Sequence, residues 1–287
     1  MPMRSRSATR SSVSRKRVSA SGGVALIILT VAALPGPRQI AMADSNAMTR
    51  QQVIAALGTA GVGRPDLSSR SFAGLDLTGL DFKGANLSAS VFNGAHLRHA
   101  NLAHCNLTVA FGRQADFRDA DLRGAQMFSM QLQGANFTGA NLSDARLIGD
   151  LSDARLDGAI LERLRAGADM TNQSMGLMNA RFESATLQGA DLRGADLSRA
   201  DLKFADLSRA RLAGARLFRA DLSGAVLSGA DLSHADLRDA TLIDADFSAA
   251  KLAGARFDGA VLRNTRGLDG AQRRGATGLP RAGATSP

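Results

Sequence analysis

Residues 190–224 read ADLRG ADLSR ADLKF ADLSR ARLAG ARLFR ADLSG, a succession of five-residue units. Every fifth position from Ala180 to Ala260 is alanine, and every position two residues later, from Phe182 to Leu262, is leucine or phenylalanine. A period of five matches neither the 3.6-residue turn of an α-helix nor the two-residue alternation of a β-strand. The sequence therefore predicts a repeat protein whose units stack on one another.

Charge is concentrated at the two ends of the chain. The formal net charge is +9. Residues 1–50 carry +7, residues 263–287 carry +4, and the residues between them carry −2. The repeats between positions 70 and 262 carry 21 basic and 23 acidic groups, so they are close to neutral. A protein that binds nucleic acid needs a basic face on its folded part, and we therefore expect no nucleic-acid partner.

The first 43 residues have the order of parts of a secretory signal peptide. A run of Arg and Lys precedes the small and apolar stretch 24–34, and the Ala-Met-Ala at 41–43 is typical of a cleavage site. The apolar stretch is short for a membrane span. We predict cleavage after Ala43, a periplasmic or secreted location, and no stable membrane span in the mature chain. An uncleaved N-terminal anchor is the alternative.

The sequence after the signal peptide divides into five parts. A short helix and a linker are expected first, with a capping box formed by Thr49 and Gln52 and an apolar helix face formed by Val53, Ile54 and Leu57. This helix is expected to cover the open end of the stacked repeats. The five parts are a helix and linker at 44–64, a first repeat block at 65–161, an irregular loop at 162–179, a second repeat block at 180–264, and a disordered tail at 265–287.

Three irregularities interrupt the repeats. Gly112 occupies a centre that should hold a bulky residue, so either Phe111 turns inward or the chain bulges there. Arg70 falls in an inward slot near the open end. The register slips back by one after Leu147, but Phe182 follows 35 residues later, which equals seven whole repeats. We expect one continuous rod with its two blocks in phase, and two separate rods are the alternative.

The A-[DN]-L-x-x pattern resembles the pentapeptide-repeat family over about residues 65–264. The resemblance implies an all-β solenoid, a right-handed quadrilateral β-helix with four repeats and twenty residues per coil. It also implies that the central Leu or Phe and the Ala two positions earlier point inward. Alternating small Ala and large Leu would interdigitate without voids. The core positions expected in the second block are Ala190, Ala195, Ala200, Ala205, Leu192, Leu197, Leu202, Leu207 and Leu212.

Residues twenty positions apart would lie above each other in such a coil, about 4.8 Å apart. One outward column then reads Asp191, Arg211, Asp231 and Lys251, which predicts a vertical ladder of opposite charges. Some family members imitate the acidic surface of DNA and bind type II topoisomerases. The near-neutral repeats and the export signal of this chain argue against that function.

The sequence contains no catalytic constellation, so we predict no enzymatic activity and no cofactor. We expect an exported, non-catalytic protein-binding or scaffold module, with a protein partner of unknown identity and an unknown oligomeric state. The alternatives are a DNA-mimic inhibitor or protector of a type II topoisomerase, and a secreted effector. The candidate interaction residues are Met170, Met175, Met178, Phe204 and Phe218.

Two clusters have a chemical alternative to a structural role. The methionines of the irregular loop could capture a soft metal, but gap-filling under the loop is the interpretation we favour. His96, His99 and His104 leave the coil in different directions, so they are expected to be solvated rather than to bind a metal. Cys105 occupies a small-residue slot and is expected to be a buried, inert thiol.

Overall fold

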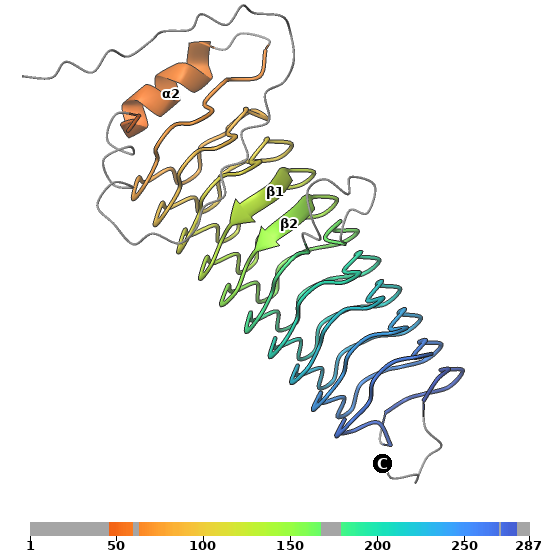
Figure 1. Cartoon of the computed structure of the whole chain (residues 1–287). Helices are drawn as coiled ribbons and strands as arrows, with labels where there is room; N and C mark the ends of the chain where they lie inside the picture. The colour runs from red at the N-terminus through yellow and green to blue at the C-terminus, as the bar shows by residue number, and fades with distance from the viewer. Residues whose placement is uncertain (1–45, 60–62, 168–178, 270, 280–287) are drawn as a thin grey trace, which may run out of the picture. The chain divides into compact units, whose positions relative to one another are not determined.

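The computed structural model describes residues 46–59, 63–167, 179–269 and 271–279. Within these residues the backbone winds into coils that stack on one another (Figure 1). Parallel bridges join residues twenty positions apart, beginning with Asp66 to Asn86, and further bridges start from Ser71, Asp76 and Asp81. A regular coil therefore has four sides and twenty residues. The four columns of outward residues are named here after their first members, as the Asp66, Ser71, Asp76 and Asp81 columns.

Each five-residue unit turns a corner for a local reason. The Asp or Asn before the central residue accepts a hydrogen bond from the backbone N–H two residues later. Asp81 Oδ1 accepts from Lys83 N at 2.9 Å, and Asp206 Oδ1 accepts from Ser208 N at 2.9 Å. A short side chain with an acceptor oxygen can make this hydrogen bond, which explains why Asp and Asn are frequent at the position. The same turn forms without it in the units that begin at Arg211, Val226 and Lys251. The second turn residue has a positive φ, as at Gly84 (φ 67°), where glycine adopts the left-handed conformation at little cost.

The interior of the solenoid is one continuous apolar cluster. Phenylalanines on successive coils stack inside it, with ring centroids 4.8 Å apart for Phe72 and Phe92 and 4.6 Å apart for Phe117 and Phe137. Burial of one such side chain contributes about 1.5–3 kcal/mol to stability. The nine core positions expected in the second block are all buried, each with at most 1% of its surface exposed: Ala190, Ala195, Ala200, Ala205, Leu192, Leu197, Leu202, Leu207 and Leu212.

Helix α2 (Arg50–Thr59) covers the N-terminal end of the coils (Figure 1). Both hydrogen bonds of the capping box are present: Thr49 N donates to Gln52 Oε1 at 2.8 Å, and Gln52 N donates to Thr49 Oγ1 at 3.3 Å. Val53 is fully buried and belongs to the core cluster. Ile54, expected on the same apolar face, is instead 47% exposed, because the buried stripe of this short helix is narrower than predicted.

At two irregular positions of the first block, the side chain considered for an inward place lies outside the core. Arg70 is exposed rather than inward, because it belongs to the terminal coil. Phe111 does not turn inward to fill the space at Gly112, since it pairs in the Ser71 column and stays partly exposed. The space is filled from the next coil instead. A Cβ on Gly112 would lie 3.0 Å from Leu132 Cδ2 and 3.3 Å from Met130 Cε.

Two regular strands are present among the described residues, and the second of them contains the start of a shortened repeat. Strands β1 (Gln126–Gln131) and β2 (Arg146–Asp150) pair in parallel, and their register shifts between Phe128 and Met130. The repeat that begins at β2 is four residues long rather than five. As a result, four consecutive bridges, one on each side, join residues 19 positions apart instead of twenty. They start from Gln131, Asn136, Asn141 and Arg146.

Gly149 makes this shortening sterically feasible. A Cβ at this position would overlap the carbonyl oxygen of Met130 and would lie 3.2 Å from its carbonyl carbon. The backbones of the two coils approach too closely there for any other residue type. The one-residue slip predicted after Leu147 thus has a defined place, at the turn that contains Gly149.

The two repeat blocks are continuous, but they are not separated by seven repeats. Asp150 pairs with Arg181, so the ladder passes directly from the first block to the second. Five repeat steps separate Leu147 from Phe182. One of them is four residues long, and another, from Arg165 to Arg181, has sixteen residues instead of five. Phe182 therefore lies on the side of the coil that follows the side of Leu147. Residues twenty positions apart do not share a column across this junction.

The ladder also extends beyond both predicted block boundaries. Residues 162–167, assigned from the sequence to the irregular loop, continue the coil: Leu164 and Ala166 are buried, and Arg165 bridges to Asp196. At the C-terminal end, where the tail from 265 was expected to be disordered, Arg266 pairs with Asp246 and Thr277 pairs with Arg256. Backbone pairing continues at both places although the Ala and Leu pattern has lapsed. No helix among the described residues is long and apolar enough to cross a membrane.

Candidate functional site

The interior provides no chemistry in the part of the chain that the structure describes. No group of three or more His, Cys, Asp or Glu side chains is arranged to hold a metal ion there. His99 Nδ1 lies 4.0 Å from Asp119 Oδ2, and both side chains are more than half exposed. Cys105 is fully buried, and this burial raises the pKa of its thiol to about 12. The interior of the described coils is apolar, and nearly all of their polar and charged side chains lie on the outer surface.

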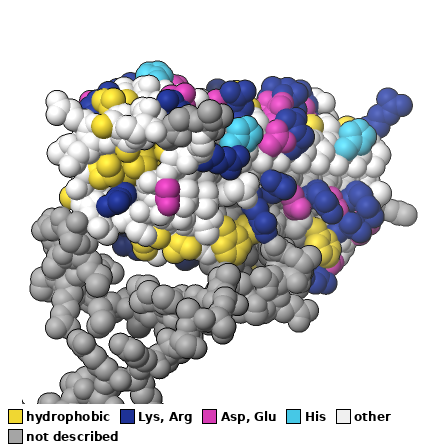
Figure 2. Space-filling model, turned by 90° about the horizontal axis from the view of Figure 1, so that it is seen from above, with side chains coloured by type: hydrophobic (Ala, Val, Ile, Leu, Met, Phe, Trp, Pro, Cys, Tyr) yellow, Lys and Arg dark blue, Asp and Glu magenta, His cyan; other side chains and the backbone are white. Residues whose placement is uncertain are grey.

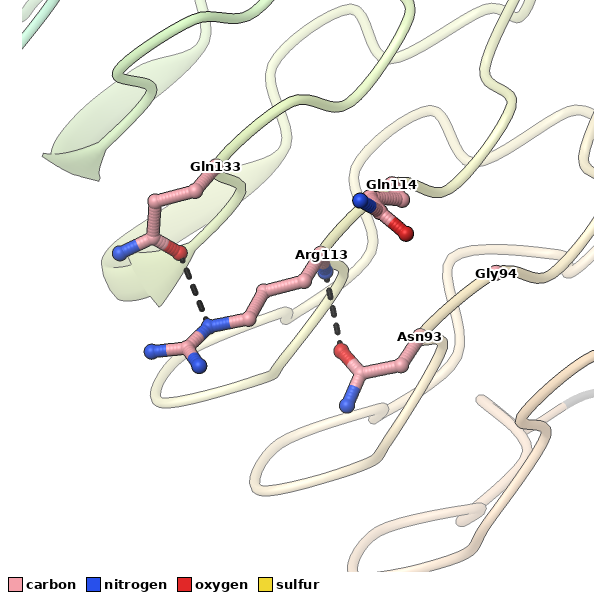
Figure 3. A pocket seen from close by; sticks show the side chains of 5 residues that line it. All are labelled: Asn93, Gly94, Arg113, Gln114 and Gln133. Atoms are coloured by element: carbon pink, nitrogen blue, oxygen red, sulfur yellow. Dashed lines mark hydrogen bonds between the residues drawn. The ribbon is translucent and has the colours of Figure 1, made fainter. Parts of the chain in front are cut away.

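One depression among the described residues is an open hollow of about 670 Å³ at the corner between the Ser71 and Asp76 columns. Figure 3 shows its lining residues, which come from three successive coils: Asn93, Gly94, Arg113, Gln114 and Gln133. Its walls are turn residues. Four of the five lining residues have polar side chains, and only Arg113 carries a formal charge.

Arg113 is held in place by amide oxygens from both neighbouring coils (Figure 3). Its backbone N–H donates to Asn93 Oδ1 at 2.9 Å. Its guanidinium donates from Nε to Gln133 Oε1 at 3.2 Å and from Nη2 to Gln131 Oε1 at 2.8 Å. The guanidinium is thus oriented without being neutralised, because an amide oxygen carries no formal charge.

Gln133 lies between the guanidinium of Arg113 and the carboxylate of Asp150 and is hydrogen-bonded to both. Its Nε2 donates to Asp150 Oδ2 at 2.8 Å while its oxygen accepts from Arg113. Asp150 is itself 3.4 Å from the guanidinium of Arg181. Burial favours a higher pKa at Asp150, but hydrogen bonds from Ser152 and Gln133 and the charge of Arg181 outweigh it and lower the pKa. The negative charge of Asp150 is therefore balanced by Arg181.

Other arginines of the solenoid bind carboxylates within their own repeat. Arg118 donates from Nε and Nη2 to the two oxygens of Asp116, at 2.8 and 2.6 Å, and lowers the pKa of that carboxyl. This two-residue spacing recurs along the chain, and each guanidinium so placed is neutralised locally. The other pairs of this kind are Arg123 with Asp121, Arg193 with Asp191, and Arg238 with Asp236.

The predicted ladder of alternating charges is present as a column, but it holds fewer ion pairs than expected. Bridges join Asp191, Arg211, Asp231 and Lys251 in order. Arg211 Nη1 lies 2.9 Å from Asp191 Oδ2. Asp231 instead accepts hydrogen bonds from Ser233, at 3.0 Å from the backbone N–H and 2.6 Å from the hydroxyl. Turn formation thus competes with vertical pairing for the same carboxylates.

An apolar strip lies beside the hollow. Val91 and Phe111 are consecutive members of the Ser71 column, and Val109, 46% exposed, occupies the preceding corner. The backbone N–H of Val109 donates to the carbonyl of Phe128 on the next coil at 2.7 Å, so Phe128 borders the same strip. All four side chains are partly or largely exposed. Figure 2 shows hydrophobic side chains gathered mainly on the N-terminal half of the face in view and charged ones mainly on the C-terminal half.

Of the five predicted interaction residues, Phe204 and Phe218 are described, and they lie at different corners of the coil. Met170, Met175 and Met178 lie outside the described residues. Phe204, 61% exposed, covers the backbone of Gly224 on the next coil, where a Cβ would lie 2.6 Å from its ring. Phe218 lies at a different corner, with the guanidinium carbons of Arg219 and Arg238 4.9 and 5.6 Å from its ring centroid.

The repeats of the chain match the family model described as pentapeptide repeats, in eight copies. The matched segments are 71–108, 95–129, 130–163, 177–214, 205–242, 215–252 and 242–272. The chain therefore belongs to the pentapeptide-repeat family, whose members fold as right-handed quadrilateral β-helices and are generally non-catalytic.

Solved structures of the same family are similar to this chain. HetL, a pentapeptide-repeat protein involved in heterocyst differentiation regulation in the cyanobacterium Nostoc sp., is 31% identical, with 78% of this chain and 96% of HetL covered and a TM-score of 0.42. QnrB1, a plasmid-mediated fluoroquinolone resistance protein, is 15% identical, with 68% and 92% covered and a TM-score of 0.44. No curated protein sequence matches the chain.

Proposed function

We propose that this protein is an exported, non-catalytic pentapeptide-repeat module that binds another protein through its outer surface. One observation carries the proposal. Side chains fill the interior of the described coils, whereas an arginine without an ion-pair partner and several exposed apolar side chains lie together at one open corner and on the side next to it. A substrate pocket would need a concave, mostly enclosed site, whereas this hollow is open and polar. A partner surface can cover such a corner.

Export is the second element of the proposal, and it is supported by the sequence of the first 43 residues. The experiment is subcellular fractionation of cells that produce the full chain with a C-terminal epitope tag, combined with N-terminal sequencing of the product. We expect protein only outside the cytoplasm, beginning at Asp44. Full-length protein confined to the cytoplasm would contradict this element.

Protein binding is tested in the exported fraction. The tagged chain is cross-linked in cells and isolated, and the proteins attached to it are identified and counted against the tagged chain. We expect a defined protein at a fixed ratio to the solenoid. Metal-independent turnover of a small molecule by the purified chain would contradict a non-catalytic role. Inhibition or protection of a type II topoisomerase by a chain retained in the cytoplasm would replace the proposal with DNA mimicry.

A further inference from the structure

We propose that the hollow around Arg113 and the adjoining apolar strip (Val91, Val109, Phe111 and Phe128) form one docking site. Its occupant is a segment of another protein that presents an Asp or Glu carboxylate one or two residues from an apolar side chain. The inference rests on the proposed function, because it assigns a place and a chemistry to the protein partner. Each part of it follows from a different feature of the surface.

The first feature is a cation that is oriented but not neutralised. Gln131 and Gln133 fix the plane of the Arg113 guanidinium, which has five N–H donors. Two of these donors bond the glutamine oxygens, and no acidic side chain among the described residues forms an ion pair with Arg113, unlike Arg118 or Arg123. A pre-oriented guanidinium binds a carboxylate with little further loss of side-chain entropy.

The second feature is apolar surface within two residues of that cation. Phe111 and Arg113 both project outward from the same coil, on either side of the inward position of Gly112. Val91 extends the strip along the Ser71 column, and Val109 borders it at the corner. Two residues of extended chain span about 6.6 Å, so a bound segment needs the same short separation between its carboxylate and its apolar group.

The third feature is a backbone that is already fully paired at this place. Phe111 N donates to Ser90 O at 2.9 Å, and Phe111 O accepts from Phe92 N at 2.6 Å. Gly112 N donates to Gln131 O at 2.7 Å. A partner therefore cannot add a strand to these coils, as it could at an open sheet edge. Recognition must come from side chains, and it depends on Arg113 and the strip.

The combination selects a protein segment over a nucleic acid. A nucleic acid needs several cations along its path to offset successive phosphates. Here the guanidinium of Arg113 lies beside the apolar strip, and that of Arg146 lies 5.8 Å from the ring centroid of Phe128. Asp150 lies one hydrogen bond beyond Gln133, so the two cations do not form a continuous basic track. A phosphate backbone would lose solvation against the strip, whereas a carboxylate beside a Leu, Val or Phe side chain complements both parts.

The experiment uses a random dodecapeptide phage library selected on the purified full chain, followed by synthesis of the enriched peptides with a fluorescein label. We expect the enriched sequences to share Asp or Glu within two positions of an apolar residue. Affinity is then measured by fluorescence anisotropy for the wild type and for Arg113→Gln. We expect a loss of about tenfold or more, the effect of one charge-assisted hydrogen-bonded pair.

A double-mutant cycle separates direct contact from altered folding. The same peptide is synthesised with its acidic residue replaced by the amide, and it is tested against both chains. Direct pairing predicts that the amide peptide binds wild type and Arg113→Gln about equally. Additive losses would overturn the inference. Equal thermal unfolding midpoints of the two chains show that the substitution leaves the fold intact.

Matched variants elsewhere on the solenoid test the location. Arg209→Gln alters an arginine that lines a second hollow, of about 490 Å³, formed with Gln188 and Ser228. Phe204→Ala removes an exposed phenylalanine far along the sequence from the strip. We expect both to bind the peptides as the wild type does, and Phe111→Ala to bind them several-fold more weakly.

Several results would overturn the inference. They are selection of peptides without acidic residues, equal loss in Arg209→Gln and Arg113→Gln, and Arg113-dependent binding of a labelled oligothymidylate. The cross-linking experiment distinguishes this failure from that of the proposed function. A partner captured equally by wild type and Arg113→Gln would leave protein binding in place and refute only this docking site.

Discussion

The guanidinium of Arg211 and the carboxylate of Asp191 lie 2.9 Å apart, although twenty residues separate them in the sequence. Asp231 follows on the other side of Arg211 in the same column. One positive charge thus separates two negative charges that would otherwise lie on adjacent coils. This arrangement avoids repulsion more than it adds attraction, since the Arg211 side chain is 53% exposed and water screens the pair.

The first prediction concerns this column. Arg211→Gln should lower the free energy of unfolding by no more than about 1 kcal/mol, because an exposed ion pair contributes little. Arg211→Asp should destabilise the fold further, because three carboxylates would then lie on consecutive coils. Denaturant unfolding at low and high salt measures both variants. Added salt should narrow the difference between them, and a difference that salt leaves unchanged would point to a cause other than charge.

The second prediction concerns the shortened repeat. Gly149→Ala should destabilise the protein by about 2 kcal/mol or more, because the new methyl group overlaps the backbone of Met130 and neither coil can move without breaking the ladder. Gly158→Ala is the control: it has open space around it but a φ of 63°, so it should cost only about 1 kcal/mol. Thermal and denaturant unfolding compare the two. Equal losses would show that the close approach at Gly149 is not limiting.

The third prediction concerns acid stability. Hydrogen bonds from arginine lower the pKa of Asp116, Asp121 and Asp236 in the folded state. The unfolded carboxyls titrate near pH 3.9. Because the folded pKa values are lower, their contribution to stability is complete above that pH and is lost as the pH falls through the folded values. The midpoint temperature of thermal unfolding should therefore decrease when the pH is lowered below about 4.

Asparagine variants provide the matched test of the acid prediction. Replacing Asp116, Asp121 and Asp236 together by Asn keeps the side-chain oxygen that accepts the turn hydrogen bond. It removes the charge and the second oxygen, which accepts from the arginine Nη2. The triple variant should be less stable at neutral pH and should lose less stability on acidification. Midpoints measured from pH 7 downward give both values. Parallel curves for the variant and the wild type would show that these carboxyls do not govern acid unfolding.

The fourth prediction concerns the only cysteine of the chain. Burial raises the pKa of Cys105 to about 12, so almost no thiolate forms near neutral pH. The folded protein should not react with iodoacetamide, and the protein in guanidinium chloride should react fully. Ser248→Cys, which introduces a thiol at an exposed turn, is the positive control. Rapid labelling of Cys105 in the folded chain would show that the coil around it opens.

The regular part of this fold follows from its period alone. Alanine and leucine at fixed positions determine which side chains are buried, as at Ala200 and Leu202. The capping box at Thr49 could also be predicted, because it depends on residues only three positions apart. The hydrogen bond that Asp or Asn before a centre accepts in the turn was missed, although the signal was present: Asp and Asn are frequent there, and their short side chains have the acceptor oxygen that this bond needs.

Irregular positions could not be predicted because they depend on the adjacent coil. The space at Gly112 is filled by Met130, which is 18 residues away. The count from Leu147 to Phe182 is correct in residues but places Phe182 on the wrong side of the coil. A four-residue and a sixteen-residue step together have the length of four regular steps, so five real steps were counted as seven. The contact of Arg113 with Gln133 could have been predicted, because residues twenty positions apart lie on adjacent coils. That spacing was applied to the outward columns and not to the turns.

The sixteen-residue step from Arg165 to Arg181 has a consequence for how such a protein can change. Eleven extra residues enter at one corner, and the bridges of Arg155 to Thr186 and Ile160 to Asp191 continue on the neighbouring sides. A corner is thus a place where chain length can vary without loss of the surrounding framework. The ladder thus tolerates added chain length at this step, which makes the step between Arg165 and Arg181 a suitable position for inserting a foreign peptide by engineering.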